Sequence, residues 1–223
     1  MTLLAERLSG DPVFNHLSER DRKDLASLAF EMRYSKGQFI CLQDDVWKRA
    51  LYLSAGKLNW VMIAPDGKRQ VVFRVSPGSI VWGHSLFDDA PMPASIEAAE
   101  DCKVCMWDGE DILPIVSRNV DAVWAITHGL VRSMRAVRDV VYGFAFHPVA
   151  GRLASLLLKH YAPAEGQASA RDLSLEEMAQ MIGSTREVIS KILHDFASDG
   201  LIEINRVEIK FNDCARLEKI FNE

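Results

Sequence analysis

The sequence predicts an α+β protein that begins with an antiparallel β-roll of the jelly-roll type, continues as one long helix and ends in a winged helix-turn-helix. Short β-like runs separated by turn residues fill positions 37–107, as in an antiparallel barrel or jelly roll. A helical pattern then continues without a break over 119–146. Two capping signals ten residues apart open a pair of short helices near the C-terminus. These observations divide the chain into 1–115, 116–146 and 147–223.

Short helices are expected in the first 33 residues, where Ser18 is a suitable N-cap for a helix that buries Leu25, Leu28 and Phe30. Short runs rich in β-branched and aromatic residues follow, and turn sequences such as Pro65-Asp66-Gly67 separate them. The expected strands are Gln38–Ile40, Ala50–Leu53, Lys57–Ile63, Gln70–Val75, Ile80–Trp82, Ser95–Ala98 and Lys103–Trp107.

The long helix carries an apolar stripe that needs a partner surface. At 1.5 Å per residue it is about 40 Å long, and its apolar residues recur every three or four positions, as in a coiled coil. Packing on the protein's own β-roll is the alternative to a dimer interface. The sequence His147-Pro148 ends the helix, because proline disfavours the α conformation of the preceding residue. The stripe consists of Val123, Ile126, Leu130, Met134, Val137, Val141 and Phe144.

The C-terminal part has the pattern of a winged helix-turn-helix. Ser174 stands three residues before Glu177, and Ser184 three before Glu187, so each pair can form a capping box at the start of a helix. Gly183 lies between the two helices, where this motif needs a tight turn. Two alternating runs, 201–204 and 207–211, then predict a hairpin around Asn205-Arg206.

The predicted exposed face of the second helix suits DNA better than a purely structural role. In the major groove an arginine can pair with guanine, a glutamate can accept a hydrogen bond from cytosine, and hydroxyls can bind bases or phosphates. The alternatives are a helical core with no ligand and a regulatory subunit that binds another protein. The candidate DNA-binding residues are Ser174, Ser184, Thr185, Arg186, Glu187, Ser190, Lys191, His194 and Arg206.

Charge and composition limit the possible functions. The net charge is −5, and positions 170–223 hold seven Lys or Arg against eleven Asp or Glu, so phosphate attraction must come from a local cluster. The 48% hydrophobic and 26% charged content is typical of a soluble globular protein. We find no apolar run long enough to span a membrane, no secretion signal and no sequence motif of an enzyme. A cytoplasmic, non-enzymatic protein is expected.

The segment IGSTREVISKIL, residues 182–193, resembles the recognition helix of the Crp/Fnr family of bacterial transcription regulators. The segments YLSAGKL and PGSIVWG are similar to parts of that family's cyclic-nucleotide-binding β-roll. The resemblance implies a sensor domain over 1–115, a dimerisation helix over 116–146 and a DNA-binding domain over 147–223. It also implies a homodimer on a palindromic operator and contact with RNA polymerase. Arg186, Glu187 and Lys191 would occupy base-reading positions.

The sequence departs from the cyclic-AMP-binding members of the family. Those proteins hold the ribose and phosphate with a Gly-Glu pair and an Arg-Ser-Ala segment. The corresponding stretches here are Gly83-His84-Ser85 and Met92-Pro93-Ala94-Ser95, and the adenine-contacting pair falls on Val137-Arg138. The missing guanidinium alone removes a strong charge-assisted pair, so a signal other than cyclic AMP is expected. The candidate effector-pocket residues are Trp82, His84, Ser85, Met134 and Arg138.

His84 falls where CO-sensing members of the family carry a haem-ligating histidine, so a haem-based sensor of CO or NO is one alternative. A hydrogen-bonded or surface histidine is the other interpretation, and a regulator without any effector, whose pocket Trp60 and Trp82 fill, is a third. An iron-sulfur cluster is not expected, since no cysteine precedes Cys41. Cys102 and Cys105 should face opposite sides of a strand, which makes joint metal ligation poor.

Overall fold

The computed structural model describes residues 2–161 and 166–222. The chain forms two compact units, one of residues 1–68 and 72–136 and one of residues 69–71 and 137–223. The long helix α5 (Val120–Phe146) has residues in both units. The three-part division at residues 115 and 146 stays a prediction, because compactness alone separates only two units.

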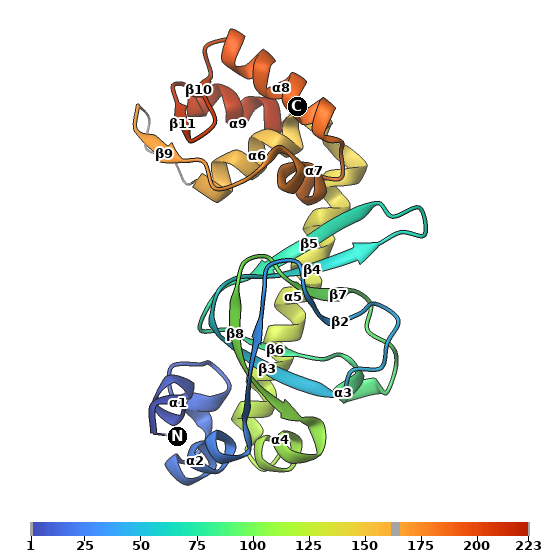
Figure 1. Ribbon diagram of the computed structural model, residues 1–223, viewed down its shortest axis with the longest axis vertical. Helices are drawn as coiled ribbons and strands as arrows, with labels where there is room; N and C mark the ends of the chain where they lie inside the picture. The colour runs from blue at the N-terminus through green and yellow to red at the C-terminus, as the bar shows by residue number, and fades with distance from the viewer. Residues whose placement is uncertain (1, 162–165, 223) are drawn as a thin grey trace. The chain divides into compact units, whose positions relative to one another are not determined.

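The strands β1 to β8 form two four-stranded antiparallel sheets, which lie in the first unit except for residues 69–71 of β5 (Figure 1). The strand orders are β1-β8-β3-β6 and β2-β7-β4-β5. All seven predicted strands are present, which confirms the jelly-roll-like β-roll. The strands are β1 (Phe30–Tyr34), β2 (Phe39–Cys41), β3 (Arg49–Ala55), β4 (Leu58–Ile63), β5 (Arg69–Val75), β6 (Ile80–Trp82), β7 (Ser95–Ala98) and β8 (Cys102–Asp108).

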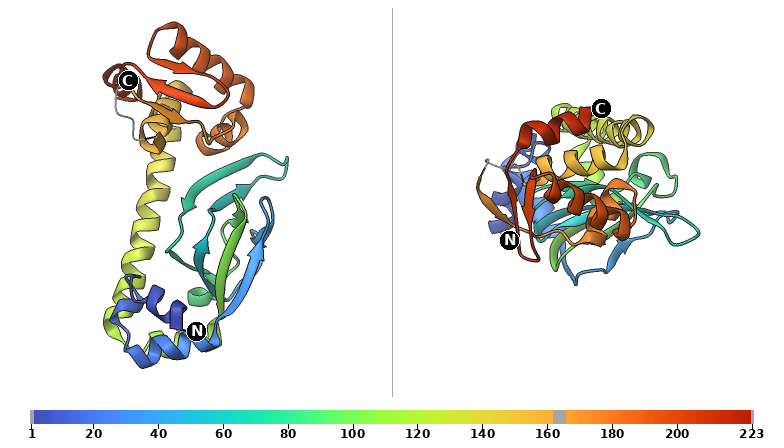
Figure 2. Two further views of the ribbon diagram at one scale, coloured as in Figure 1. Left: turned by 60° about the vertical axis from the view of Figure 1, so that its left-hand side comes forward. Right: turned by 90° about the horizontal axis from the view of Figure 1, so that it is seen from above.

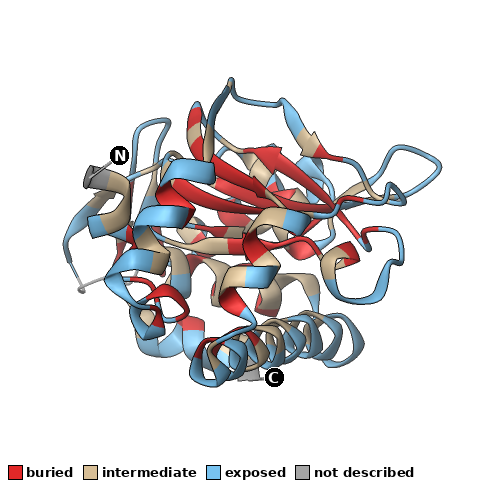
Figure 3. Ribbon diagram, turned by 90° about the horizontal axis from the view of Figure 1, so that it is seen from below, coloured by how far each residue is buried: buried red, intermediate tan, exposed pale blue. Residues whose placement is uncertain are grey.

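Alternating side chains on the central strands give the first unit two cores. Leu51 and Leu53 of β3 point into the core between the two sheets. Ala50 and Tyr52 of the same strand point outward, where they meet the N-terminal helices and the start of α5. The buried residues of the sheets appear red in Figure 3. The helices of this unit are α1 (Thr2–Leu8), η1 (Phe14–His16), α2 (Glu19–Leu28), α3 (Ser85–Asp88) and α4 (Gly109–Val116).

The N-terminal prediction is confirmed in part. The Ser18 hydroxyl accepts a hydrogen bond from the Asp21 amide at 3.1 Å and caps α2, and Leu25 is fully buried. Leu28 is 42% exposed, however, and Phe30 lies in β1 and not in a helix. The helix ends at Ala29, which is extended, because the next residues pair with β8 in the register Phe30↔Met106. That pairing joins segments far apart in the chain and leaves no local sequence signal.

The C-terminal part of the chain is a winged helix-turn-helix with its own apolar core, and from residue 137 on it is coloured yellow to red in Figure 2. The strand β9 pairs with β11 and was not predicted. The C-terminal helix α9 was not predicted either. The elements of this unit after α5 are α6 (Val149–Tyr161), β9 (Ala168–Ala170), α7 (Leu175–Ile182), α8 (Arg186–Ser198), β10 (Ile202–Ile204), β11 (Glu208–Phe211) and α9 (Cys214–Asn222).

No helix in the described ranges is both long enough and apolar enough to cross a membrane.

Candidate functional site

The first helix of the helix-turn-helix, α7, begins with the predicted capping box. The Ser174 hydroxyl accepts from the Glu177 amide at 3.1 Å, and the Glu177 carboxylate accepts from the Ser174 amide at 2.8 Å. The helix ends at Gly183, which adopts a left-handed conformation with φ of 63°. A Cβ atom at Gly183 would collide with the ring of Phe144. Glycine is therefore required at this turn by its backbone conformation and by the close approach of a ring.

The second helix, α8, begins one residue later than predicted. Its N-cap is Thr185, whose hydroxyl accepts from the Val188 amide at 3.4 Å, so the predicted capping box of Ser184 and Glu187 is wrong. The Ser184 amide still donates to the carbonyl of Ala179 at 3.0 Å. Ser184 therefore belongs to the turn that ends α7, and the next helix can start only after it.

One side of α8 is exposed and polar. Ile189, Leu193 and Phe196 are buried on the opposite side, and Val188 is 39% exposed. Because residues three and four positions apart share a helix face, the polar candidates form a continuous surface that begins at the N-terminal end. Thr185, Arg186, Glu187, Ser190, Lys191 and His194 are all exposed, as are Ser174 and Arg206, whereas Ser184 is half-buried.

The exposed cations around α8 are available to an incoming anion. Within the described residues, Arg186, Lys191 and Arg206 form no ion pair or hydrogen bond, whereas Lys210 is paired with Glu203 at 3.1 Å. The backbone amide of Glu187, followed by the Thr185 hydroxyl, lowers the pKa of the Glu187 carboxyl and keeps it ionised. The surface thus offers cations for phosphates and one carboxylate acceptor for a base amino group.

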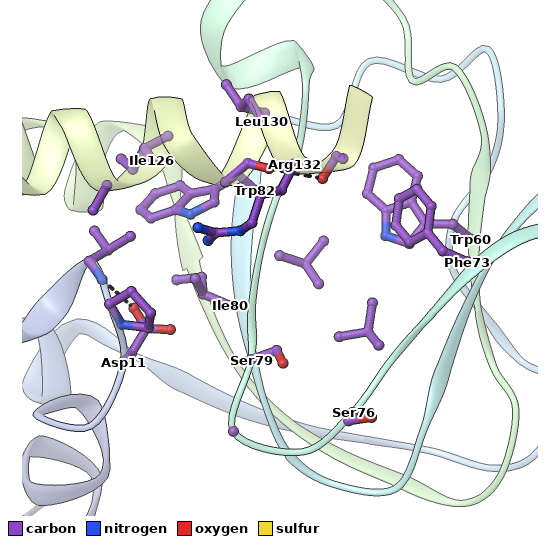
Figure 4. A pocket seen from close by; sticks show the side chains of 18 of the residues that line it. Asp11, Trp60, Phe73, Ser76, Ser79, Ile80, Trp82, Ile126, Leu130 and Arg132 are labelled. Atoms are coloured by element: carbon purple, nitrogen blue, oxygen red, sulfur yellow. Dashed lines mark hydrogen bonds between the residues drawn. The ribbon is translucent and has the colours of Figure 1, made fainter. Parts of the chain in front are cut away.

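The first unit contains a cavity of about 500 Å³ between α5 and the strands β5 and β6, shown in Figure 4. Ile126 and Leu130 of α5 line one wall. On the opposite wall Trp60 packs against Phe73 with ring centroids 5.3 Å apart, and Trp82 lies farther along the cavity. A cavity of this volume, lined by both apolar and polar side chains, is in the range of small-molecule sites.

The cavity includes two of the five predicted pocket residues, Trp82 and His84. Ser85 is fully buried outside it, and its hydroxyl accepts from the Trp47 amide at 3.1 Å. Met134 is 75% exposed on α5 and does not line the cavity. Arg138 lies in the second unit and pairs with Asp139 at 2.6 Å. These last three residues are not among those that line the cavity of the single chain, and their assignment to an effector pocket stays a prediction.

His84 meets the chemical requirements of a neutral ligand. Burial lowers the pKa of its imidazole, and the nearby Asp88 carboxylate opposes this shift. Its ring packs against Trp60 with centroids 5.1 Å apart. An uncharged imidazole can stack on a flat ring or donate a nitrogen lone pair to a metal. The residues that line the cavity include no cysteine, methionine or second histidine, so a haem there would have His84 as its protein ligand.

Sequence reasoning missed three charged residues that line the cavity, Asp11, Arg74 and Arg132. Arg132 could have been found, since it lies three residues after Gly129 and seven after the buried Ala125 on one helix face. Arg74 and Asp11 give no such signal, because their position depends on how distant segments pack.

The cysteines do not form a metal site. Cys102 lies in the core between the sheets and Cys105 in the outer core, as predicted from their spacing on β8. Burial raises the pKa of the Cys41 thiol to about 11, which disfavours the thiolate that binds metals. Among the residues described, no three His, Cys, Asp or Glu side chains are grouped closely enough to hold a metal ion.

The predicted dimer stripe on α5 is only partly exposed. Ile126 is buried in the core of its own unit and Leu130 is half-buried at the cavity, so neither belongs to the exposed part of the stripe. Val123, Met134, Val137, Val141 and Phe144 are exposed. The structure adds Val120, Trp124 and Val131 as further exposed apolar residues of the helix. Together with Met134 and Val141 they have the 4-7-3-7 spacing of one coiled-coil face.

Two family models match the chain: a cyclic nucleotide-binding domain over residues 31–119 and a Crp-like helix-turn-helix domain over residues 151–220. The chain is 26% identical to the cyclic AMP receptor protein of Thermus thermophilus, over 96% of this chain and 98% of that one. It is 25% identical to a Crp-like cAMP-activated global transcriptional regulator of Mycobacterium tuberculosis, over 83% and 85% of the two chains.

Solved structures show the same fold. A transcriptional regulator of the Crp/Fnr family from Eubacterium rectale superposes with a TM-score of 0.78 at 20% identity, over 95% of this chain and 98% of that one. The c-di-GMP-responsive global regulator CLP of Xanthomonas campestris gives a TM-score of 0.76 at 16% identity, over 87% and 99%. The curated relatives named above are transcription regulators and not enzymes.

Proposed function

Because the chain belongs to the Crp/Fnr family of DNA-binding transcription regulators, we propose that it binds a palindromic operator as a homodimer and responds to a signal other than cyclic AMP. The observation that carries this proposal is the exposed face of α8, where Arg186, Glu187 and Lys191 lie without ion-pair partners among the described residues. Contact with RNA polymerase at the operator is part of the same proposal.

The recognition helix supports base-specific binding. Arg186 and Glu187 lie in the first turn of α8, the end of a recognition helix that reaches base edges in helix-turn-helix proteins. Lys191 and Arg206 can bind phosphates from the helix and from the hairpin turn. A two-fold dimer would place two such helices about 34 Å apart, one turn of DNA, on a palindromic site.

The test is selection of bound sequences from a random duplex library, followed by affinity measurement on the enriched site. We expect a motif with two-fold symmetry. Arg186→Ala and Glu187→Ala should each lose about 1–3 kcal/mol of specific binding, whereas Lys219→Ala on α9 serves as a matched surface control. Unchanged operator affinity in both recognition-helix variants would contradict the base-reading roles and favour a protein partner instead.

Two buried serines support a signal other than cyclic AMP. Ser85 and Ser95 lie in the segments that would hold the ribose and phosphate, but their hydroxyls accept hydrogen bonds from the amides of Trp47 at 3.1 Å and Gln43 at 2.8 Å. Neither serine lines the cavity. Calorimetric titration should therefore show no binding of cyclic AMP at micromolar concentration, although the relatives named above include cyclic-AMP receptors.

A haem-based gas sensor is the second candidate, and the neutral, half-buried His84 in the cavity wall is the observation that favours it. Bound haem would supply CO or NO binding at its iron, and His84 would be its protein ligand. An absorption spectrum with added haem, before and after reduction and CO exposure, tests this against His84→Ala. A spectrum of free haem in both proteins would remove the candidate. The open cavity beside Trp60 and Trp82 argues against a regulator whose pocket these side chains fill.

A further inference from the structure

We propose that the cavity beside α5 binds a small aromatic oxyanion without a sugar, such as an aryl carboxylate, and that Arg132 binds its anionic group. The inference rests on the proposed function, because it names the class of effector for the cavity of the first unit.

The charges that line the cavity favour an anion. The side chains include two guanidinium groups, Arg74 and Arg132, and one carboxylate, Asp11. Arg74 donates to the Asn59 side chain at 3.1 Å, and Arg132 has no hydrogen bond or ion pair within the described part of the chain. Asp11 is only 2% exposed and accepts from the Val13 amide at 2.8 Å, as the dashed line in Figure 4 shows.

The Asp11 carboxylate does not compete for the arginines. Its oxygen also accepts from the Phe14 amide at 3.4 Å, so it fixes the local turn between α1 and η1. Arg132 projects from α5 into the cavity in Figure 4 and is free to pair with a ligand. A guanidinium forms two parallel hydrogen bonds with a carboxylate, sulfonate or phosphate, and these are stronger than bonds between neutral groups.

The other walls favour a flat ring. Trp60 packs against both Phe73 and His84, with ring centroids 5.3 and 5.1 Å apart, and together they form an aromatic wall. Burial lowers the pKa of His84, which disfavours a cation on this wall. Aromatic rings prefer offset or edge contacts with other rings, which this wall offers. Ile126 and Leu130 supply the opposite, aliphatic side.

Gly129 leaves space in the cavity for such a ring, between Arg132 and the aromatic wall. It lines the cavity from α5, and a Cβ atom there would approach only the Arg132 guanidinium, at 4.0 Å. A larger side chain at this position would therefore fill the cavity without colliding with the backbone. Ser85 and Ser95, which lie in the segments that correspond to the family's ribose and phosphate contacts, are outside the cavity, so a ligand without a sugar is favoured over a cyclic nucleotide.

Quenching of tryptophan fluorescence tests the ligand class on the full-length protein, because Trp60 and Trp82 line the cavity. The probes are 1-naphthoate, its neutral amide 1-naphthamide, 1-naphthyl phosphate and cyclic AMP. We expect naphthoate to bind at least tenfold more tightly than naphthamide, and cyclic AMP to bind more weakly than both. Preference for naphthyl phosphate over naphthoate would identify the oxyanion as a phosphate and not a carboxylate.

Three variants locate the site. Arg132→Gln should reduce the preference for naphthoate over naphthamide to less than threefold, whereas Arg135→Gln, on the same helix but outside the cavity, should preserve it. Gly129→Leu should abolish binding of both naphthalene probes while the circular dichroism spectrum stays unchanged. Equal binding of naphthoate and naphthamide, or a preference that survives Arg132→Gln, would overturn the inference. Operator binding by the same proteins is measured in parallel. If the protein prefers naphthoate but binds no operator, the proposed function is contradicted and the ligand inference is not.

Discussion

Arg152 is a single residue that ties two helix ends together inside the second unit. Its guanidinium donates to the carbonyl of Ile182, the last residue of α7, and to that of His147, which follows α5, each at 2.9 Å. It also lies 4.9 Å from the centre of the Phe144 ring. Burial lowers the pKa of this guanidinium, so the hydrogen bonds form in a partly dry environment, where charged donors are most effective.

Arg152→Met should therefore lower the free energy of unfolding of the second unit by about 1–3 kcal/mol, because two carbonyls lose a charged donor while the aliphatic volume is kept. Chemical denaturation followed by circular dichroism measures the change. Arg216→Met is the matched control, since Arg216 is exposed and makes one long hydrogen bond of 3.4 Å to Asp199. Equal stability of the two variants would show that the hydrogen bonds of Arg152 contribute little.

His84 predicts a pH dependence of stability with a defined sign. Burial holds the pKa of its imidazole below the ordinary value of 6.5, so the unfolded chain takes up a proton first as the pH falls. The stabilising contribution is complete above about pH 6.5 and is lost as the pH falls toward the folded-state pKa. His84→Gln should flatten the decrease in melting temperature between pH 7.5 and 5.5, and comparison at each pH cancels the other titrating groups. Parallel curves for both proteins would contradict this.

At the residue scale, the sequence could identify His84 and Trp82 as cavity residues because they fall in a recognisable segment. It could not identify Arg74 or Asp11. Asp11 lies beside β6 only because the N-terminal turn packs on the outer sheet, and the two segments are far apart in the chain. Chemistry that depends on contacts between distant segments leaves no local pattern.

At the element scale, the sequence offers two adjacent residues that could be the N-cap of α8, and the structure shows which of them caps the helix. Thr185 caps the helix, whereas Ser184 belongs to the turn that ends α7. Thr185→Ala should cost about 1 kcal/mol of stability, since the Val188 amide loses its side-chain acceptor. Ser184→Ala, its matched control, should cost less than half as much. Thermal melts of the two variants measure the difference, and a larger loss in Ser184→Ala would favour the capping box predicted from sequence.

Elements with a strong local period were predictable, and elements defined by long-range pairing were not. The seven strands, the long helix and the helix-turn-helix all carry turn residues, caps or apolar spacing of their own. By contrast, β1 forms only because it pairs with β8 and β9 only because it pairs with β11. The sequence Ala168–Ala170 has little intrinsic preference for a strand, so the neighbouring hairpin decides its conformation.

At the scale of the whole molecule, the exposed apolar face of α5 is the surface on which we expect the proposed dimer to form. Ala122, Ala125 and Ile126 are buried against the first unit, whereas Trp124, Val131 and Met134 are exposed. The stripe predicted from the sequence combined residues of both faces, because apolar residues occur all around the helix in this region. Only the structure shows which of them have no partner in their own unit.

Val131→Glu combined with Met134→Glu should convert the proposed dimer into monomers. Two carboxylates from each chain would lie in an apolar interface without counterions, and each buried unpaired charge costs several kcal/mol. Sedimentation velocity at micromolar concentration should give the mass of one chain, 25.0 kDa, with an unchanged circular dichroism spectrum. Val46→Glu, a similar change at an exposed apolar residue outside α5, should stay dimeric. Because each monomer can bind only one half-site, the double variant should also lose at least tenfold in operator affinity. A double variant that sediments as a dimer would show that another surface holds the two chains together.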